Sequence, residues 1–266
     1  MSWAKAPSMA VPPLPHPLVE TFGRPTWREW RQRAEAVELA ETGVPITASP
    51  PRSIVVVPGF LGSVDSMGSL VEWLVRAGHS VRVADLDGNF RSSSWATDRI
   101  VETLNRAGVP SVLIGHSRGG QQCRVAAHRN PDLVDHLITL GAPVRFHVPR
   151  HFALRAAVEI LRAAGRLGAL GGHDRTADRK YEASLYASFT PDVPWTAIHS
   201  RSDGFVAWQA CMDAAATDVE VNCSHRGLIA SVPAFTAIAA TISAVSLLRD
   251  HDDSAQTGAP CPKPQS

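Results

Sequence analysis

From residue 53 onwards, short apolar runs alternate with longer segments whose apolar residues recur at helical spacing. The short runs predict strands, and the segments between them predict helices. The expected strands are Ser53–Val57, Ser80–Ala84, Ser111–Ile114, His136–Leu140, Trp195–His199 and Val219–Asn222, and the expected helices are residues 66–77, 95–107, 118–129, 152–167 and 232–248. Because nearly continuous apolar strands need cover on both faces, this alternation predicts an α/β fold with a doubly wound, mostly parallel sheet.

The two ends of the chain differ from this middle region. Residues 1–24 are rich in proline and are expected to be irregular, and residues 250–266 have the composition of a disordered tail. We therefore expect one α/β domain over residues 25–249. Within the domain, residues 144–190 separate the fourth expected strand from the fifth and are too long for a simple connection. They predict a helical insertion, and two interpretations stay open for it: a cap over the functional site or an amphipathic crossover packed on the sheet.

A first helix is expected ahead of the first strand. Thr26 and Glu29 fit a capping box, in which each side chain bonds a backbone N–H at the start of a helix. The helix would then begin at Thr26. Its expected apolar face consists of Trp27, Trp30, Ala34 and Val37, which recur at helical spacing.

Composition and charge exclude several classes of partner. The 266 residues include 26 basic and 25 acidic side chains, so a net charge of +1 gives no electrostatic reason to expect nucleic acid or an anionic membrane. The first residues lack the apolar stretch of a secretory signal, which favours a cytoplasmic location. Residues 227–248 carry no charge and are long enough to span a bilayer. Because they include Pro233 and several hydroxyl side chains, we expect a buried C-terminal helix there, with a membrane span as the alternative.

The strongest chemical signal is the pentapeptide Gly115-His116-Ser117-Arg118-Gly119, which follows an expected strand and leads into an expected helix. This is the G-x-S-x-G nucleophile elbow in its strand–turn–helix context. The turn is tight, and side chains two residues before and after the serine would collide with neighbouring backbone. Glycine avoids that collision, and the serine oxygen is held near a helix N-terminus that favours negative charge.

A second loop, Val57-Pro58-Gly59-Phe60-Leu61-Gly62-Ser63, follows the first expected strand. Acyl transfer produces an oxyanion that needs two N–H donors, one from the residue after the nucleophile and one from such a loop. The expected donors are therefore Arg118 and Phe60, with Leu61 as the fallback for Phe60. Gly59 lets this loop approach the substrate.

These motifs make the chain similar to a known family. It resembles the α/β-hydrolase superfamily, particularly the lipases and esterases, over about residues 53 to 248. The matching segments, in the family's order, are VVVPGFLGS, LIGHSRGG, LITLGAP, IHSRSDGFV and NCSHRGL. One departure is that many lipases have His-Gly in the oxyanion loop, where this chain has Pro58-Gly59; a backbone donor does not require the histidine.

The resemblance implies that a catalytic acid and a histidine follow the nucleophile in the chain. Asp203 lies in a glycine-containing turn after a late strand, and it is preferred over Asp213 and Asp218. His225 follows the last expected strand and is the expected general base. Gly59, Leu61, His116 and His199 are expected to line the substrate pocket.

Other features have less specific interpretations. Cys211 and Cys223 flank the last expected strand and are expected either to be free thiols or to form a disulfide that braces the histidine loop. The segment Asp85-Leu86-Asp87-Gly88-Asn89 is interpreted as a hydrated turn rather than a pocket wall. No Cys/His spacing matches a zinc site and no dinucleotide fingerprint occurs, so neither a metal nor an organic cofactor is expected.

The sequence thus predicts a serine hydrolase that cleaves carboxylic esters through an acyl-enzyme, with Ser117, His225 and Asp203 as a catalytic triad. Its expected partner is a small-molecule ester or a lipid-like substrate. A thioesterase, amidase or lactonase with the same triad is an alternative, as is a non-catalytic binding member of the fold. Peripheral membrane contact remains open if the insertion exposes its apolar face.

Overall fold

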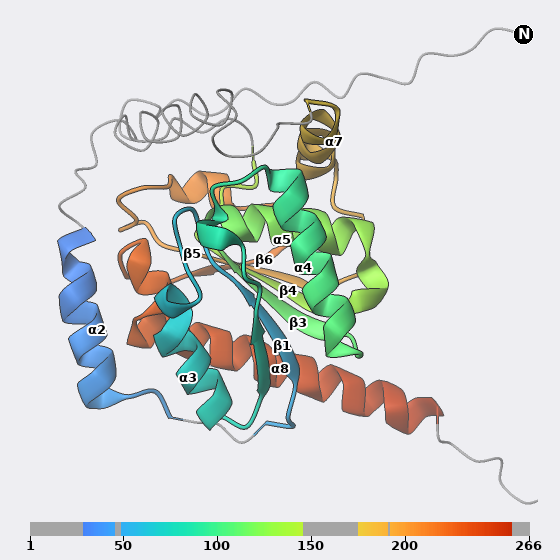
Figure 1. Ribbon diagram of the computed structural model, residues 1–266. Helices are drawn as coiled ribbons and strands as arrows, with labels where there is room; N and C mark the ends of the chain where they lie inside the picture. Colours follow the sequence, from blue (N-terminus) through green and yellow to red (C-terminus); the bar gives the residue numbers. More distant parts are fainter. Residues whose placement is uncertain (1–28, 46–48, 146–174, 191, 257–266) are drawn as a thin grey trace, which may run out of the picture.

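A six-stranded parallel sheet forms the centre of the computed structural model, which describes residues 29–45, 49–145, 175–190 and 192–256 (Figure 1). The strands are β1 (Ser53–Val57), β2 (Ser80–Val83), β3 (Ser111–His116), β4 (Val134–Leu140), β5 (Trp195–His199) and β6 (Thr217–Glu220), in the order β2-β1-β3-β4-β5-β6. The expected doubly wound parallel sheet is confirmed. The order changes direction between β1 and β3, and at such a switch point the loops after the two strands face each other across a crevice.

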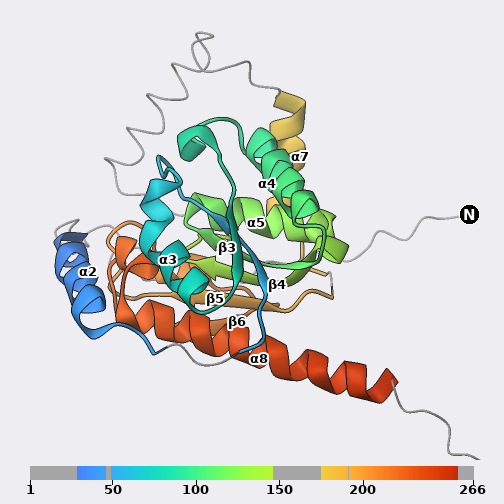
Figure 2. The same cartoon turned by 60° about the horizontal axis from the view of Figure 1, so that its bottom comes forward.

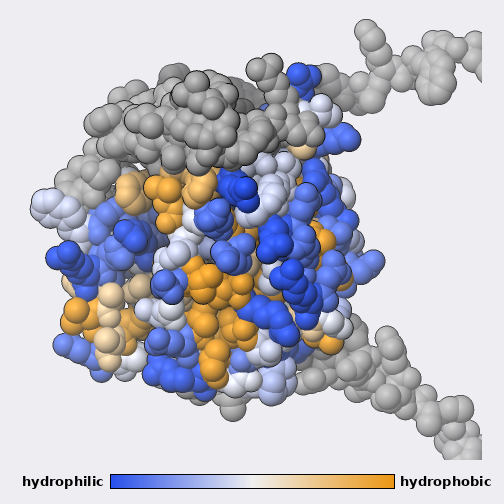
Figure 3. All heavy atoms as spheres, viewed as in Figure 1, coloured by the Kyte–Doolittle hydropathy of each residue, from blue (hydrophilic) through white to orange (hydrophobic). Residues whose placement is uncertain are grey.

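Helices lie on both sides of this sheet. They are α2 (Arg31–Thr42), α3 (Gly68–Arg76), α4 (Ser93–Ala107), α5 (Arg118–Arg129), α7 (Arg175–Tyr186) and α8 (Val232–Gln256). Short 3-10 helices occur at η2 (Asp65–Met67), η3 (Asp87–Asn89), η4 (Pro131–Leu133), η5 (Trp208–Cys211) and η6 (Arg226–Ile229). Figures 1 and 2 show α3 and α8 on one side of the sheet and α4, α5 and α7 on the other. The coloured part of the face seen in Figure 3 mixes apolar patches with hydrophilic side chains.

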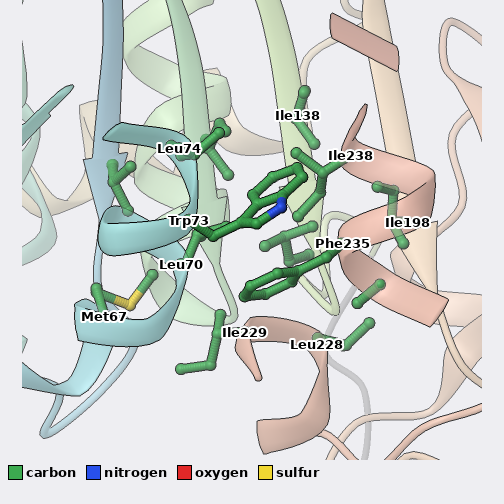
Figure 4. Close-up of a cluster of buried hydrophobic side chains, with 14 of the residues drawn as sticks. Met67, Leu70, Trp73, Leu74, Ile138, Ile198, Leu228, Ile229, Phe235 and Ile238 are labelled. Carbon is green, nitrogen blue, oxygen red and sulfur yellow. The ribbon is translucent and has the colours of Figure 1, made fainter. Parts of the chain in front are cut away.

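Each of the four central strands, β1, β3, β4 and β5, supplies side chains to two separate apolar layers. On one face, Ile54 and Val56 of β1 pack with residues of α3 and α8, and there Trp73 and Phe235 lie 5.0 Å apart between ring centroids (Figure 4). On the other face, Val55 and Val57 pack with apolar residues of α4 and α5. Burial on both faces explains why the strands are continuous apolar runs instead of alternating ones.

The C-terminal helix α8 confirms the expected buried helix. Phe235, Ile238 and Ile242 are at most 1% exposed in the layer between α8 and the sheet. Among the helices of the described ranges, none combines the length and the hydropathy that a membrane-spanning segment needs. The helix continues to Gln256, beyond the domain boundary expected at residue 249.

The insertion after β4 contains a helix that the sequence pattern did not predict. In α7, Tyr181 and Leu185 are buried and pack against Val125 of α5. Most of the other residues of α7 are polar or alanine, which is why no apolar period indicated the helix. The helix expected at residues 152–167 lies outside the described residues, so the choice between cap and crossover stays a prediction.

Two elements differ from expectation in their position or orientation. Strand β6 is Thr217–Glu220 instead of Val219–Asn222; as an edge strand paired only with β5, it is mostly exposed and has no continuous apolar run to mark it. Helix α2 is Arg31–Thr42, and the start expected at Thr26 lies outside the described residues, so the capping box stays a prediction. The expected apolar face of α2 is wrong, because Trp30 and Val37 are 83% and 53% exposed whereas Glu35 is buried. The inward face of α2 therefore carries a carboxylate, whose partners belong to the site.

Candidate active site

Ser117 occupies a strained turn between β3 and α5. Its backbone angles, φ 53° and ψ −122°, lie outside the regions that side-chain-bearing residues usually adopt, and such strain concentrates at functional sites. The expected steric reason for the flanking glycines is confirmed. A Cβ on Gly115 would lie 2.6 Å from Gly120 Cα, and one on Gly119 would collide with the carbonyl oxygens of Val57 and Pro58.

Asp203 follows β5 and is 4% exposed. Its Oδ1 accepts hydrogen bonds from the backbone N–H groups of Phe205 at 2.8 Å and Val206 at 2.7 Å. Its Oδ2 lies 2.6 Å from Nδ1 of His225. The turn thus fixes one carboxylate oxygen on backbone donors and presents the other to the imidazole.

His225 lies in the loop between β6 and η6 and is 5% exposed. Its ring packs edge-on against Phe205, with centroids 5.5 Å apart, and lies 4.7 Å from the ring of His116. Burial alone would lower the pKa of His225, but the adjacent Asp203 carboxylate outweighs it, and the pKa is raised above its usual value. Among the described residues, no hydrogen bond joins the Ser117 hydroxyl to His225.

The pKa of His116 is shifted in the opposite direction to that of His225. Burial, with the neighbouring His225 as a second cause, lowers the pKa of His116 to about 3. Its Nε2 lies 3.1 Å from the backbone oxygen of His225. Because a carbonyl oxygen can only accept, Nε2 carries the proton, and the neutral ring donates it to the backbone of the histidine loop.

The loop after β4 leaves room for the Asp203–His225 pair. Gly141 has φ 57°, and a Cβ there would lie 3.2 Å from Nδ1 of His225 and 3.3 Å from Oδ2 of Asp203. Ser200 joins the acid loop to the histidine loop by donating its hydroxyl to the Cys223 carbonyl at 2.6 Å. The loops after β4, β5 and β6 therefore pack closely around the Asp203–His225 pair and hold its geometry.

The loop after β1 approaches the nucleophile from the other side. A Cβ on Gly59 would lie 3.2 Å from Ser117 Cβ, so the chain passes close to the elbow there. The ring of Phe60 lies 5.8 Å from the Arg118 guanidinium, and Leu61 is 60% exposed with φ 57°. The loop thus presents apolar side chains beside Ser117.

A buried amide network fixes this loop, and it corrects the interpretation of residues 85–89 as a hydrated turn. Asn89 is 0% exposed, and its Nδ2 donates to the Pro58 carbonyl at 2.8 Å. Asn89 and Gln122 also exchange two hydrogen bonds of 2.9 Å, and the Arg118 guanidinium donates to the Asn89 carbonyl at 2.9 Å. The sequence contains no local signal for these contacts, because the partners lie about thirty residues apart.

The remaining candidates make other contacts. The ring of His199 is buried and stacks on Trp208, with centroids 5.7 Å apart. Asp213 lies 3.6 Å from Arg124, and Asp218 lies within β6, so of the three aspartates considered, Asp203 contacts His225. A pocket role for His199 stays a prediction.

The cysteines near the site are reduced. Cys211 and Cys223 are buried free thiols, which excludes the disulfide alternative in this structure. Burial raises the pKa of Cys223 to about 12, so its thiol stays protonated and is a poor nucleophile despite lying two residues from His225. In the described part of the chain, no cluster of His, Cys, Asp and Glu side chains has the grouping of a metal site.

Two glutamates near the N-terminal end of the described chain contact the histidine loop, which the sequence did not indicate. Glu29 accepts hydrogen bonds from the backbone of His225 and of Gly204, and Glu35 accepts them from Ser224. The sequence predicted a helix-capping role for Glu29. Its partners are about 175 to 200 positions away, so no local pattern reveals them.

Comparisons with known proteins agree with this fold. Residues 52–166 match the sequence profile of a family described by the alpha/beta hydrolase fold. Esterase YbfF of Escherichia coli (strain K12) is 32% identical over 115 residues, which make up 40% of this chain and 44% of that esterase. The matched stretch is therefore less than half of that relative's length.

Solved structures agree in fold. The monoacylglycerol lipase of Paleococcus ferrophilus superposes with a TM-score of 0.56 at 17% identity, over 74% of this chain and 97% of the lipase. The lipase BlEst2 of Bacillus licheniformis gives 0.54 at 18% identity, over 76% of this chain and 95% of the lipase. At these identities the likeness concerns the fold alone. The parallel sheet, the strained serine turn between β3 and α5, and the family profile that matches residues 52–166 show that the chain has the α/β-hydrolase fold.

Proposed function

We propose that this protein is a serine hydrolase that cleaves carboxylic esters through an acyl-enzyme. The observation that carries the proposal is the buried contact of 2.6 Å between Asp203 Oδ2 and His225 Nδ1, next to the strained turn that presents Ser117. The acid holds the imidazole with Nδ1 protonated, which leaves Nε2 as the basic nitrogen.

The proposed reaction has two halves. Nε2 of His225 takes the Ser117 proton as the oxygen attacks the ester carbonyl, and the imidazolium then protonates the departing alcohol. In the second half, His225 takes a proton from water, the resulting hydroxide attacks the acyl-enzyme, and Ser117 regains its proton as the acid leaves. We expect Ser117 Oγ and Nε2 to come within hydrogen-bond distance when substrate binds, since such contacts are often long in empty sites.

The backbone N–H groups of Phe60 and Arg118 are proposed to stabilise the oxyanion, with Leu61 as the alternative to Phe60. Arg118 begins α5, so its N–H lies at a helix N-terminus, where negative charge is favoured. The exposed Leu61 and the neighbouring Phe60 supply apolar surface beside Ser117. This surface supports a substrate with an acyl chain or another apolar body, bound as a small molecule.

The test is hydrolysis of p-nitrophenyl esters of increasing chain length by wild type and by Ser117→Ala. We expect kcat to fall by about three orders of magnitude or more in the variant, because the acyl-enzyme cannot form. Ser243→Ala, a partly exposed serine on α8, is the matched control and should retain wild-type activity. Undiminished hydrolysis by Ser117→Ala would contradict the assignment.

A fluorophosphonate probe tests the same serine without assuming a substrate. It should label wild type at Ser117 and leave Ser117→Ala unlabelled. An acyl-CoA panel run beside the ester panel measures whether esters or thioesters are preferred. Absence of a Ser117 adduct in folded protein would favour a non-catalytic member of the fold.

A further inference from the structure

We propose that Glu29 is a positioning residue for the Asp203–His225 pair, so that the segment entering α2 is part of the active-site architecture. The proposal rests on the proposed function, because it assigns Glu29 a role in orienting the proposed base.

One carboxylate oxygen joins the two catalytic loops. Oε1 of Glu29 accepts hydrogen bonds from the backbone N–H of Gly204 and from that of His225, each at 3.0 Å. Gly204 directly follows Asp203, so the shared acceptor fixes the residue after the acid relative to the base itself. Oε2 accepts a third, weaker bond from the backbone N–H of Arg226 at 3.2 Å. A carboxylate suits this place because it accepts several N–H groups at once and donates none.

The same end of the chain holds the histidine loop at a second point. Glu35 of α2 accepts the Ser224 N–H at 2.9 Å and the Ser224 hydroxyl at 2.5 Å. Ser224 Oγ in turn accepts the Gly227 N–H at 2.9 Å. A Cβ on Gly227 would collide with the Glu35 carboxylate, so a glycine there makes room for it.

Helix α2 packs at two places: its Leu39 contacts the apolar layer formed with α3 and α8, and its Glu35 contacts the histidine loop. Figures 1 and 2 show it at the side of the molecule, and it contacts η6 and α8. Of its residues, Glu35 is the buried one, whereas Trp30 and Val37 face outward. The helix therefore lacks the expected apolar face, and the carboxylate of Glu35 takes part in its packing at the histidine loop.

Glu29 also affects the pKa of His225. The charged and titratable groups around His225 are Asp203 from the loop after β5, His116 from β3, Glu29 before α2 and Arg226 beside it in the chain. Burial lowers the pKa of His225; Asp203 and, more weakly, Glu29 raise it, whereas Arg226 lowers it. A purely mechanical tether would hold the loops without this charge effect, so the two roles are separable.

The experiment uses the full chain with Glu29→Gln, Glu29→Ala and, as the matched control, Glu38→Gln at an exposed position of α2. Glutamine keeps an acceptor oxygen for Gly204 and His225 but removes the charge. The pKa of His225 is read by NMR titration of the imidazole, whose signal is assigned by its absence from His225→Gln. Activity on a p-nitrophenyl ester is followed against pH, and thermal unfolding monitors the fold.

We expect Glu29→Gln to lower the pKa of His225 by about 0.5 to 1, because an anion that favours the imidazolium is lost. The acid limb of the kcat/KM profile should move to lower pH by the same amount. Glu29→Ala should reduce kcat about tenfold or more with little change in KM, since the base is then misplaced. Glu38→Gln should match wild type in every measurement.

The proposal is overturned if the NMR pKa of His225 is unchanged in a folded Glu29→Gln protein. It is also overturned if Glu38→Gln shifts that pKa as much as Glu29→Gln does. If Glu29→Ala does not fold, the pKa of His225 in Glu29→Gln tests the proposal by itself. If wild type hydrolyses no ester while the pKa of His225 falls in Glu29→Gln, the ester hydrolase proposal fails and the positioning role of Glu29 stands.

Discussion

At the scale of single residues, the basicity of His225 depends on its contact with Asp203. The carboxylate offsets the penalty for burying a charged imidazole and raises the pKa of His225 above its usual value. The base must be neutral to accept the Ser117 proton, so activity should fall as the pH drops through this raised pKa. His116, with a pKa of about 3, stays neutral over the same range and cannot produce this limb.

Asp203→Asn should therefore change both the rate and its pH dependence. We expect kcat to fall by roughly four orders of magnitude, because asparagine no longer holds the productive tautomer. The acid limb of kcat/KM should move to lower pH, since the charge that favours the imidazolium is gone. Both are measured from ester hydrolysis between pH 4 and pH 9 at about half-unit steps. Asp132→Asn, at an exposed position, is the control, and an acid limb that stays at the wild-type pH in Asp203→Asn would refute the coupling.

Some residues of the candidate site could be predicted from the sequence, and others could not. Chain order after the G-x-S-x-G turn singled out Asp203 and His225, and their side chains do meet at 2.6 Å. The sequence indicates Glu29 only as a helix cap and Asn89 only as part of a turn, because their observed partners lie far along the chain. Hydrogen bonds of this kind leave no period and no spacing rule in the sequence, so only the folded chain identifies them.

At the scale of elements, the packing of α5 against the end of β1 limits what the elbow tolerates. Gly119→Ala would place a methyl group against the carbonyl oxygens of Val57 and Pro58, and the loop carrying Phe60 would have to shift. We expect a loss of about 1 to 3 kcal/mol in the free energy of unfolding, together with a fall in kcat. Urea unfolding and ester hydrolysis measure the two effects.

Gly68→Ala provides the matched control, because a Cβ at that position at the start of α3 meets nothing within 4 Å. It should be neutral or slightly stabilising, since alanine favours a helix over glycine. Equal effects of the two substitutions would show that lost backbone freedom, and not the contact between α5 and β1, governs the outcome.

Helices and strands could be predicted from the sequence where burial in the core determines which of their residues are apolar. Strands β1 and β5 and helix α5 have the expected bounds, because their apolar runs or stripes face a closed core. The edge strand β6 was displaced by two residues, and α7 was missed, since each buries little apolar surface. The wrong face of α2 was expected to be buried. A carboxylate takes part in the packing of this helix, and hydrophobic periodicity cannot indicate a buried carboxylate.

At the scale of the whole molecule, buried neutral histidines link folding to pH. His136 on β4 is 8% exposed, its Nε2 lies 2.9 Å from the Thr196 hydroxyl oxygen, and burial lowers its pKa to about 4. His116 behaves likewise, whereas the raised pKa of His225 acts in the opposite direction. Between about pH 6.5 and pH 4 the unfolded chain therefore binds protons at His136 and His116 that the folded chain does not bind.

The free energy of unfolding should consequently decrease as the pH falls through this range. For His136 alone, the linkage between its unfolded value near 6.5 and its folded value gives a loss of about 2 kcal/mol from pH 7 to pH 5. His136→Gln keeps a partner for Thr196 but cannot titrate, so urea unfolding at the two pH values should show a loss smaller by about that amount. His128→Gln, at a less buried histidine, should change the loss less. If His136→Gln and wild type lost equal stability on acidification, proton uptake at His136 would not contribute to the acid sensitivity of this fold.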